Sequence, residues 1–132
     1  MPSKGSADQP REPPLVVLVE DDYESREQLA FLIERRGLRV STAADGAQAL
    51  RVLQSGPRPT LIILDLMMPV MDGWETRAAL SAHSDWSSIP VVLLSGVDDI
   101  EDQVQALHAV DFLNKPVDLH KLHDILDRWC PR

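Results

Sequence analysis

Three short, continuously apolar runs, each followed by a polar residue, constrain the fold of this chain more than any other feature. The runs are LVVLV (15–19), LIIL (61–64) and VVLL (91–94), and they are rich in β-branched residues. Such runs are typical of strands that helices cover on both faces. Longer amphipathic segments separate them, and this alternation predicts a parallel sheet built from successive βαβ units.

Two weaker strands and five helices complete the predicted alternation. LRVST (38–42) and DFLN (111–114) fit strands nearer the edges of the sheet. The predicted helices are 23–36, a segment around Leu50 and Leu53 that ends near Gly56, 73–83, 100–109 and 119–129. Gly37 stands where a helix C-cap is expected.

Composition limits the domain count and disfavours several kinds of partner. The chain has 132 residues, of which 44% are hydrophobic, enough for one core. A net charge of −8 argues against binding to nucleic acid. No run approaches the roughly 18 apolar residues of a membrane span. The single cysteine, Cys130, suits a reducing compartment. We therefore expect a cytoplasmic protein with no membrane or nucleic-acid partner.

Residues 1–14 differ from the rest of the chain. They hold four of the ten prolines and almost no apolar residue, so burial cannot offset the entropy lost on ordering them. We expect 1–14 to be a flexible tail and 15–132 to be one folded domain. Because the last predicted helix ends close to the final residue, we also expect no output domain.

Polar residues whose side chains can bind ligands or take part in reactions stand at the ends of the predicted strands. Glu20 and Asp21 follow the first apolar run, Asp65 the second and Ser95 the third, and Lys115 follows the last predicted strand. In an open α/β sheet, ligands bind at the carboxyl ends of the strands. If the strands before Asp21 and Asp65 are neighbours, about 4.8 Å apart, both side chains reach a common centre.

This acidic cluster predicts a divalent cation. Two carboxylates about 5 Å apart repel by roughly 3 kcal/mol at an effective dielectric of about 20, and a cation offsets that repulsion. Mg²⁺ takes oxygen ligands and typically binds one or two carboxylates together with phosphate oxygens. Each residue alone has an ordinary explanation as a turn or a helix cap, which is our interpretation of Asp22. Their joint occurrence at successive strand ends favours one functional site.

Four segments resemble the receiver domain of two-component response regulators, over essentially all of 15–130. They are VVLVEDDYESRE, LIILDLMMPVMDGWE, IPVVLLSG and DFLNKPVDLHKL, in the expected order and spacing. The resemblance implies a flavodoxin-like (βα)5 three-layer sandwich with a five-stranded parallel sheet of order 2-1-3-4-5. It also implies a role in a phosphorelay.

The resemblance further implies roles for individual residues. Asp65 would accept a phosphoryl group. Asp21 and Asp65 would bind Mg²⁺ (or Mn²⁺) with the backbone carbonyl of Met67, and Glu20 would hold the metal through water. Lys115 would pair with the acceptor carboxylate and then with the phosphoryl group.

A second group of residues would report phosphorylation. Ser95 would bond a phosphoryl oxygen and vacate space for Phe112, which stands at the switch-aromatic position of the family. Many relatives have tyrosine there, so the switch would work without a hydroxyl. The Lys115–Pro116 peptide bond would be cis, which costs little before proline.

The implied partners are proteins. The phosphoryl group would come from a sensor histidine kinase or a histidine phosphotransfer protein. The fourth helix, fifth strand and fifth helix would then present a changed face to a downstream protein. Met67 and Val97 flank the acceptor and cannot position a water, so we predict slow loss of the phosphoryl group. We expect the chain to catalyse only its own phosphorylation and dephosphorylation.

Two other functions stay open. One is a docking module of the same fold that works without phosphorylation. The other is a hydrolase with Asp65 as nucleophile, although such enzymes usually place a second acid where this chain has Met67. Outside the site, Trp86 lies in the polar segment HSDWSS and is expected to be exposed, and His108 is expected to be a surface histidine.

Overall fold

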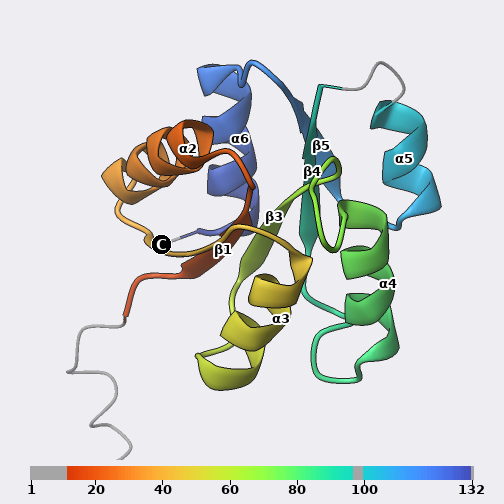
Figure 1. Cartoon of the computed structure of the whole chain (residues 1–132). Helices are drawn as coiled ribbons and strands as arrows, with labels where there is room; N and C mark the ends of the chain where they lie inside the picture. Colours follow the sequence, from red (N-terminus) through yellow and green to blue (C-terminus); the bar gives the residue numbers. More distant parts are fainter. Residues whose placement is uncertain (1–11, 97–99, 132) are drawn as a thin grey trace, which may run out of the picture.

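The computed structural model describes residues 12–96 and 100–131, so most of the predicted tail, 1–11, and Val97 lie outside the described residues (Figure 1). Strands and helices alternate in the order β1 (Leu15–Val19), α2 (Tyr23–Arg35), β2 (Arg39–Ala43), α3 (Gly46–Ser55), β3 (Leu61–Asp65), α4 (Gly73–Ala82), β4 (Val91–Ser95), α5 (Ile100–Ala106), β5 (Asp111–Asn114) and α6 (Leu119–Trp129).

All neighbouring strands of the sheet run parallel, in the order β2-β1-β3-β4-β5. Every residue of β1, β3 and β4 is buried, as expected for strands with helices on both sides. The predicted fold class and strand order are therefore confirmed.

The sheet separates two apolar clusters. Side chains alternate along a strand, so Val16 and Leu18 of β1 pack with α2 and α6, whereas Val17 and Val19 pack with α3, α4 and α5. Figure 1 shows these two helical layers on opposite faces of the sheet. The resulting three layers leave the carboxyl ends of the strands at one end of the molecule.

Capping side chains fix where the helices begin. An aspartate side chain caps α2, α3, α4 and α6, at Asp22, Asp45, Asp72 and Asp118 respectively. Asp22 accepts the Ser25 N–H at 2.9 Å, which confirms its interpretation as a cap. Gly37 follows α2 with φ 84°, a left-handed conformation that glycine adopts without strain.

The predicted helix 100–109 is shorter in the structure, where α5 ends at Ala106. His108 has φ 54°, which takes the backbone out of the helical region. Arg77 of α4 donates from Nε to the carbonyl oxygen of Leu107 at 2.7 Å. The end of α5 is thus set by a tertiary contact and by a left-handed residue that is not glycine.

Trp86 is not the exposed residue that its polar neighbours suggested. It is half-buried, packs against the α3–α4–α5 cluster and stacks on His83 with ring centroids 3.8 Å apart. Its indole face is therefore covered by the chain itself. Among the described residues, no helix combines the length and apolar character that crossing a membrane requires.

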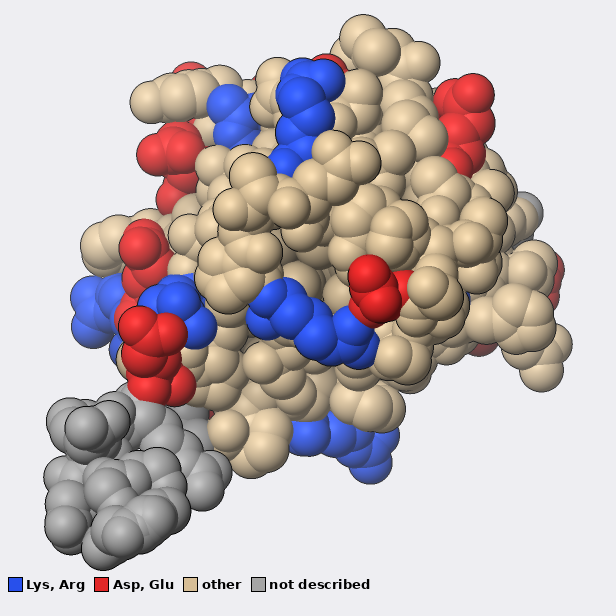
Figure 2. All heavy atoms as spheres, turned by 90° about the horizontal axis from the view of Figure 1, so that it is seen from below, with Lys and Arg blue, Asp and Glu red and all other residues tan. Residues whose placement is uncertain are grey.

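Basic side chains gather at the end of the molecule where the strands begin. Figure 2 views this end and shows several separate groups of basic side chains on it, some with acidic side chains beside them. Arg39 donates from Nε to the Pro13 carbonyl oxygen at 2.8 Å, and Arg58 donates to Ser88 Oγ at 2.8 Å. Positive charge thus lies at the start of the strands.

Candidate functional site

Three carboxylates converge at the opposite end, beyond the carboxyl ends of β1 and β3. Because these strands are adjacent, Glu20 and Asp21 after β1 lie beside Asp65, the last residue of β3. One oxygen of each residue lies within 4.8 Å of the others. Glu20 and Asp65 are 0% and 1% exposed, whereas Asp21 is exposed. Two buried charges and one solvated charge therefore share one centre.

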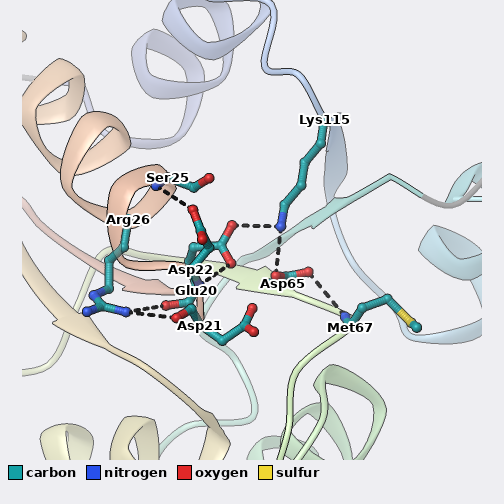
Figure 3. Close-up of polar contacts among 8 residues, drawn as sticks. All are labelled: Glu20, Asp21, Asp22, Ser25, Arg26, Asp65, Met67 and Lys115. Atoms are coloured by element: carbon teal, nitrogen blue, oxygen red, sulfur yellow. Dashed lines mark hydrogen bonds and ion pairs between the residues drawn. The ribbon is translucent and has the colours of Figure 1, made fainter.

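Lys115 contacts the two buried carboxylates. It follows β5, and its Nζ lies 2.7 Å from Glu20 Oε1 and 2.9 Å from Asp65 Oδ2 (Figure 3). Desolvation lowers the pKa of Lys115, but hydrogen bonds to Glu20 and Asp65 and their charges outweigh it and raise the pKa overall. Lys115 therefore stays charged at neutral pH. Its peptide bond to Pro116 is cis.

Both oxygens of Asp65 are engaged. While Oδ2 faces Lys115, Oδ1 accepts the backbone N–H of Met67 at 3.1 Å. The Met67 side chain is 60% exposed and borders the site from the segment between β3 and α4. These contacts fix the orientation of the carboxylate.

The segment that leads from β1 into α2 is tied at several points. The Asp22 N–H donates to Glu20 Oε2 at 3.1 Å. Arg26 Nη1 donates to the carbonyl oxygen of Glu20 at 2.9 Å and to that of Asp21 at 3.3 Å. Figure 3 shows Arg26 approaching this segment from α2. These contacts with the main chain thus hold Glu20 and Asp21 in place.

Ser95 and Phe112 lie on β4 and β5, the two strands beyond β3 in the sheet. Ser95 is fully buried at the end of β4, where Leu94 pairs with Asp65 in register. Phe112 of β5 is half-buried, and Lys121 Nζ of α6 lies 3.3 Å from its ring centroid. Ser95 thus lies on the strand next to Asp65, and Phe112 lies one strand further, in a cation–π contact that the sequence did not predict.

The residues present fit a hard divalent cation. The acidic cluster offers carboxylate oxygens alone, which are the ligands that Mg²⁺ and Mn²⁺ prefer. Three carboxylates face one ammonium group, so negative charge remains for a cation to offset.

Removing the Asp21 carboxylate should stabilise the fold when no metal is present. Burial, followed by a hydrogen bond and the charge of Glu20, raises the pKa of Asp21 above 3.8. A carboxyl with a raised native pKa favours folding less as the pH rises through that range. We expect Asp21→Asn to raise the free energy of unfolding by up to about 1 kcal/mol at neutral pH, because water screens an exposed group.

Urea unfolding in EDTA, from acid to neutral pH, would check this prediction. The gain from Asp21→Asn should vanish below pH 3.8, where Asp21 is protonated in both states. A variant that is less stable than wild type at neutral pH would contradict the inferred repulsion.

Val70, on the segment between β3 and α4, carries local strain. It has φ 68°, is 84% exposed, and lies in a tight turn in which the Met71 N–H donates to the Pro69 carbonyl oxygen at 2.7 Å. A β-branched residue in the left-handed region costs about 1–2 kcal/mol. Strain of this kind is often kept at functional sites.

Val70→Asn should therefore stabilise the domain by about 1 kcal/mol, because asparagine tolerates the left-handed conformation. Val70→Gly should be close to neutral, since glycine relieves the strain but adds entropy to the unfolded chain. Thermal unfolding would measure both variants. If both melted well below wild type, the side chain of Val70 would be stabilising and the strain argument wrong.

Two arginines that bind main-chain carbonyls were not predicted. Arg77 is 6% exposed and occupies the buried face of α4 with Gly73, Thr76 and Leu80. That helical spacing was a signal that could have revealed it. Arg26 left no such signal, because its acceptors are main-chain carbonyls, which every residue possesses.

Comparison with known proteins agrees with this geometry. The family model for the response regulator receiver domain matches residues 16–127. The chain is 39% identical over 111 residues to the transcriptional regulatory protein PrrA of Mycobacterium tuberculosis, covering 83% of this chain and 46% of PrrA. The chain thus spans about half the length of PrrA and of several other curated relatives.

Solved structures give the same result. A response regulator receiver protein from Pseudomonas putida matches with a TM-score of 0.82 and 31% identity, covering 90% of this chain and 99% of that one. The receiver domain of the sensor histidine kinase PA1611 from Pseudomonas aeruginosa, with a magnesium ion coordinated in its active site cleft, matches with a TM-score of 0.80 and 26% identity, covering 91% and 99%. This chain therefore belongs to the response regulator receiver domain family of two-component signalling.

Proposed function

We propose that this receiver domain accepts a phosphoryl group on Asp65 from a phosphohistidine of a sensor histidine kinase or histidine phosphotransfer protein. The main support is the convergence of Glu20, Asp21 and Asp65 within 4.8 Å, with Lys115 on the two buried members. Asp65 offers the nucleophilic oxygen. Lys115 and a cation bound by the acidic cluster would offset the negative charge around it.

In the proposed step, a carboxylate oxygen of Asp65 attacks phosphorus. A P–O bond forms while the P–N bond breaks, and its electron pair leaves with the imidazole of the donor. Lys115, which contacts Asp65 Oδ2, would move to the phosphoryl oxygens and offset the negative charge that they carry. Ser95 would bond one of those oxygens.

Asp21 and Asp65 would hold Mg²⁺ or Mn²⁺ together with the Met67 backbone carbonyl, and Glu20 would act through water. The bound cation would offset charge on the transferring group. The related receiver domain of PA1611 supports this assignment, since it carries magnesium in its cleft.

Incubation with acetyl phosphate, with and without MgCl₂, tests the proposal. Intact mass should show one phosphoryl group per chain, dependent on magnesium, and borohydride reduction before peptide mapping should locate it at Asp65. The absence of any adduct would favour a phosphorylation-independent docking module. Many turnovers of a phosphoester without a stable adduct would favour a hydrolase.

Met67→Asn should shorten the lifetime of the phosphorylated form by about tenfold or more, because an amide can orient an attacking water and a thioether cannot. Met67 is exposed beside the acceptor, so the exchange should leave the fold intact. Phosphate release after rapid removal of acetyl phosphate would measure the lifetime. An unchanged rate would mean that Met67 does not limit access of water.

The proposed output is a protein-binding face formed by α5, β5 and α6. Phe112 supports this, because it lies on β5 near Ser95 and contacts Lys121 of α6. Beryllofluoride, which mimics the acyl phosphate, should shift NMR signals on this face, and unchanged signals there would exclude it. We also propose that the domain works in the cytoplasm. The free thiol of Cys130 suits that compartment.

A further inference from the structure

Asp21 differs from the other two carboxylates in how it is held. Lys115 forms ion pairs with Glu20 and Asp65, whereas Asp21 forms no ion pair with any basic side chain of residues 12–96 and 100–131. Apart from its hydrogen bond with Glu20, the direction of its exposed side chain therefore depends on its own backbone.

Arg26 holds that backbone. Its Nη1 donates to two successive carbonyl oxygens, at 2.9 Å to Glu20 and at 3.3 Å to Asp21 (Figure 3). These carbonyls lie between β1 and α2, where the chain turns out of the sheet. Bridging both of them fixes the orientation of successive peptide planes.

Arg26 is itself well placed to act as a fixed support. It is half-buried in the first turns of α2, and its guanidinium lies 5.5 Å from the ring centroid of Tyr23. Its backbone N–H donates to the Asp22 carbonyl oxygen at 2.9 Å. The side chain is therefore ordered by its helix and by an aromatic neighbour.

We propose that Arg26 is a positioning residue for divalent cation binding, which holds the main chain of Glu20 and Asp21 without contacting the cation. This inference rests on the proposed metal site. Second-layer contacts of this kind typically change metal affinity by about tenfold or more when removed.

Arg26→Met separates positioning from simple electrostatics, because the two effects have opposite signs. Losing a positive charge near three carboxylates would by itself strengthen cation binding. Losing the support of the main chain should weaken it. We expect the Mg²⁺ dissociation constant, measured by titration calorimetry with MgCl₂, to rise about tenfold in Arg26→Met.

Arg35→Met is the matched control. Arg35 is the last residue of the same helix, at the end away from the segment after β1, and its guanidinium lies 5.7 Å from the ring centroid of Phe31. Its loss should leave the dissociation constant unchanged or slightly lower. Arg26→Lys keeps the charge with a different reach, so its affinity should lie between those of wild type and Arg26→Met.

The outcomes distinguish this inference from the proposed function. If wild type binds Mg²⁺ and Arg26→Met binds it as tightly or more tightly, positioning by Arg26 is wrong and the metal site stands. If wild type does not bind Mg²⁺, both fail. Unfolding in EDTA checks that the variants are folded, and should Arg26→Met prove unfolded, Arg26→Lys and Arg26→Gln decide by the same comparison.

Discussion

A chain carrying Asp65→Asn is expected to incorporate no phosphoryl group from acetyl phosphate, where wild type takes up one. An amide oxygen cannot form the acyl phosphate, so the loss should be complete. The fold should survive, because asparagine has the same shape and keeps an oxygen for the Met67 N–H, now 3.1 Å from Asp65 Oδ1. Intact mass spectrometry measures incorporation, and circular dichroism confirms folding.

Asp102→Asn provides the control for the loss of one carboxylate. Asp102 lies exposed on α5 and does not belong to the acidic cluster, so its replacement should leave incorporation unchanged. If Asp65→Asn took up the phosphoryl group at the wild-type level, another residue would be the acceptor.

Lys115→Met should have the largest effect on stability. It leaves Glu20 and Asp65, 0% and 1% exposed, without the cation that lies within 2.9 Å of both. Breaking a buried ion pair by removing one partner typically costs about 3–5 kcal/mol. We expect a loss of that size at neutral pH in EDTA, and a fall in the rate of phosphoryl transfer of about 100- to 1000-fold.

The pH dependence distinguishes lost charge from lost packing. Both carboxylates are buried, so the stability deficit of Lys115→Met should be present wherever they carry charge. In wild type, the raised pKa of Lys115 gives stability that is present below 10.5 and is lost at higher pH. That alkaline loss should be smaller in Lys115→Met.

Lys121→Met is a matched control, because the side chains of Lys121 and Lys115 are both 34% exposed. Lys121 contacts Asp111 at 3.7 Å, which is not deeply buried, so its loss should cost about 1–2 kcal/mol. If Lys115→Met were no less stable than Lys121→Met, Lys115 would not be offsetting two buried charges. Urea unfolding of both variants provides the comparison.

The fold was predictable because the apolar runs are unambiguous. The strands β1, β3 and β4 are where the runs predicted them, although β3 and β4 each extend one residue further, to Asp65 and Ser95. A polar residue ends an apolar pattern, but Asp65 and Ser95 still pair in register, with Leu94 and Asn114. Strand pairing, which the sequence pattern does not report, decides those ends.

The weaker elements show where local pattern fails. The second strand was predicted at 38–42 and lies at Arg39–Ala43, because its half-exposed residues give little periodic signal. The fourth predicted helix ends three residues early, at Ala106, since His108 adopts a left-handed φ and Arg77 bonds the Leu107 carbonyl. A contact between distant segments cannot be seen in either segment alone.

The acidic cluster was predictable because topology brings strand ends together. Glu20, Asp21 and Asp65 lie together because β1 and β3 are parallel neighbours, whose carboxyl ends meet at the same edge of the sheet. The contacts that other side chains make around the site were not predictable. Arg26 acts on main-chain carbonyls, and Lys121 reaches Phe112 from a different element. Their roles depend on packing distances that spacing in the sequence does not encode.

The edge position of β5 has a consequence for how a partner could bind. As the last strand in the order β2-β1-β3-β4-β5, it has one side without a neighbouring strand in the sheet. It spans only Asp111–Asn114, and Lys121 places its ammonium group against Phe112. Short, charged edges resist the addition of a foreign strand and hence uncontrolled polymerisation. A partner at the proposed α5–β5–α6 face would therefore be recognised through side chains, and this edge would not act as a template for aggregation.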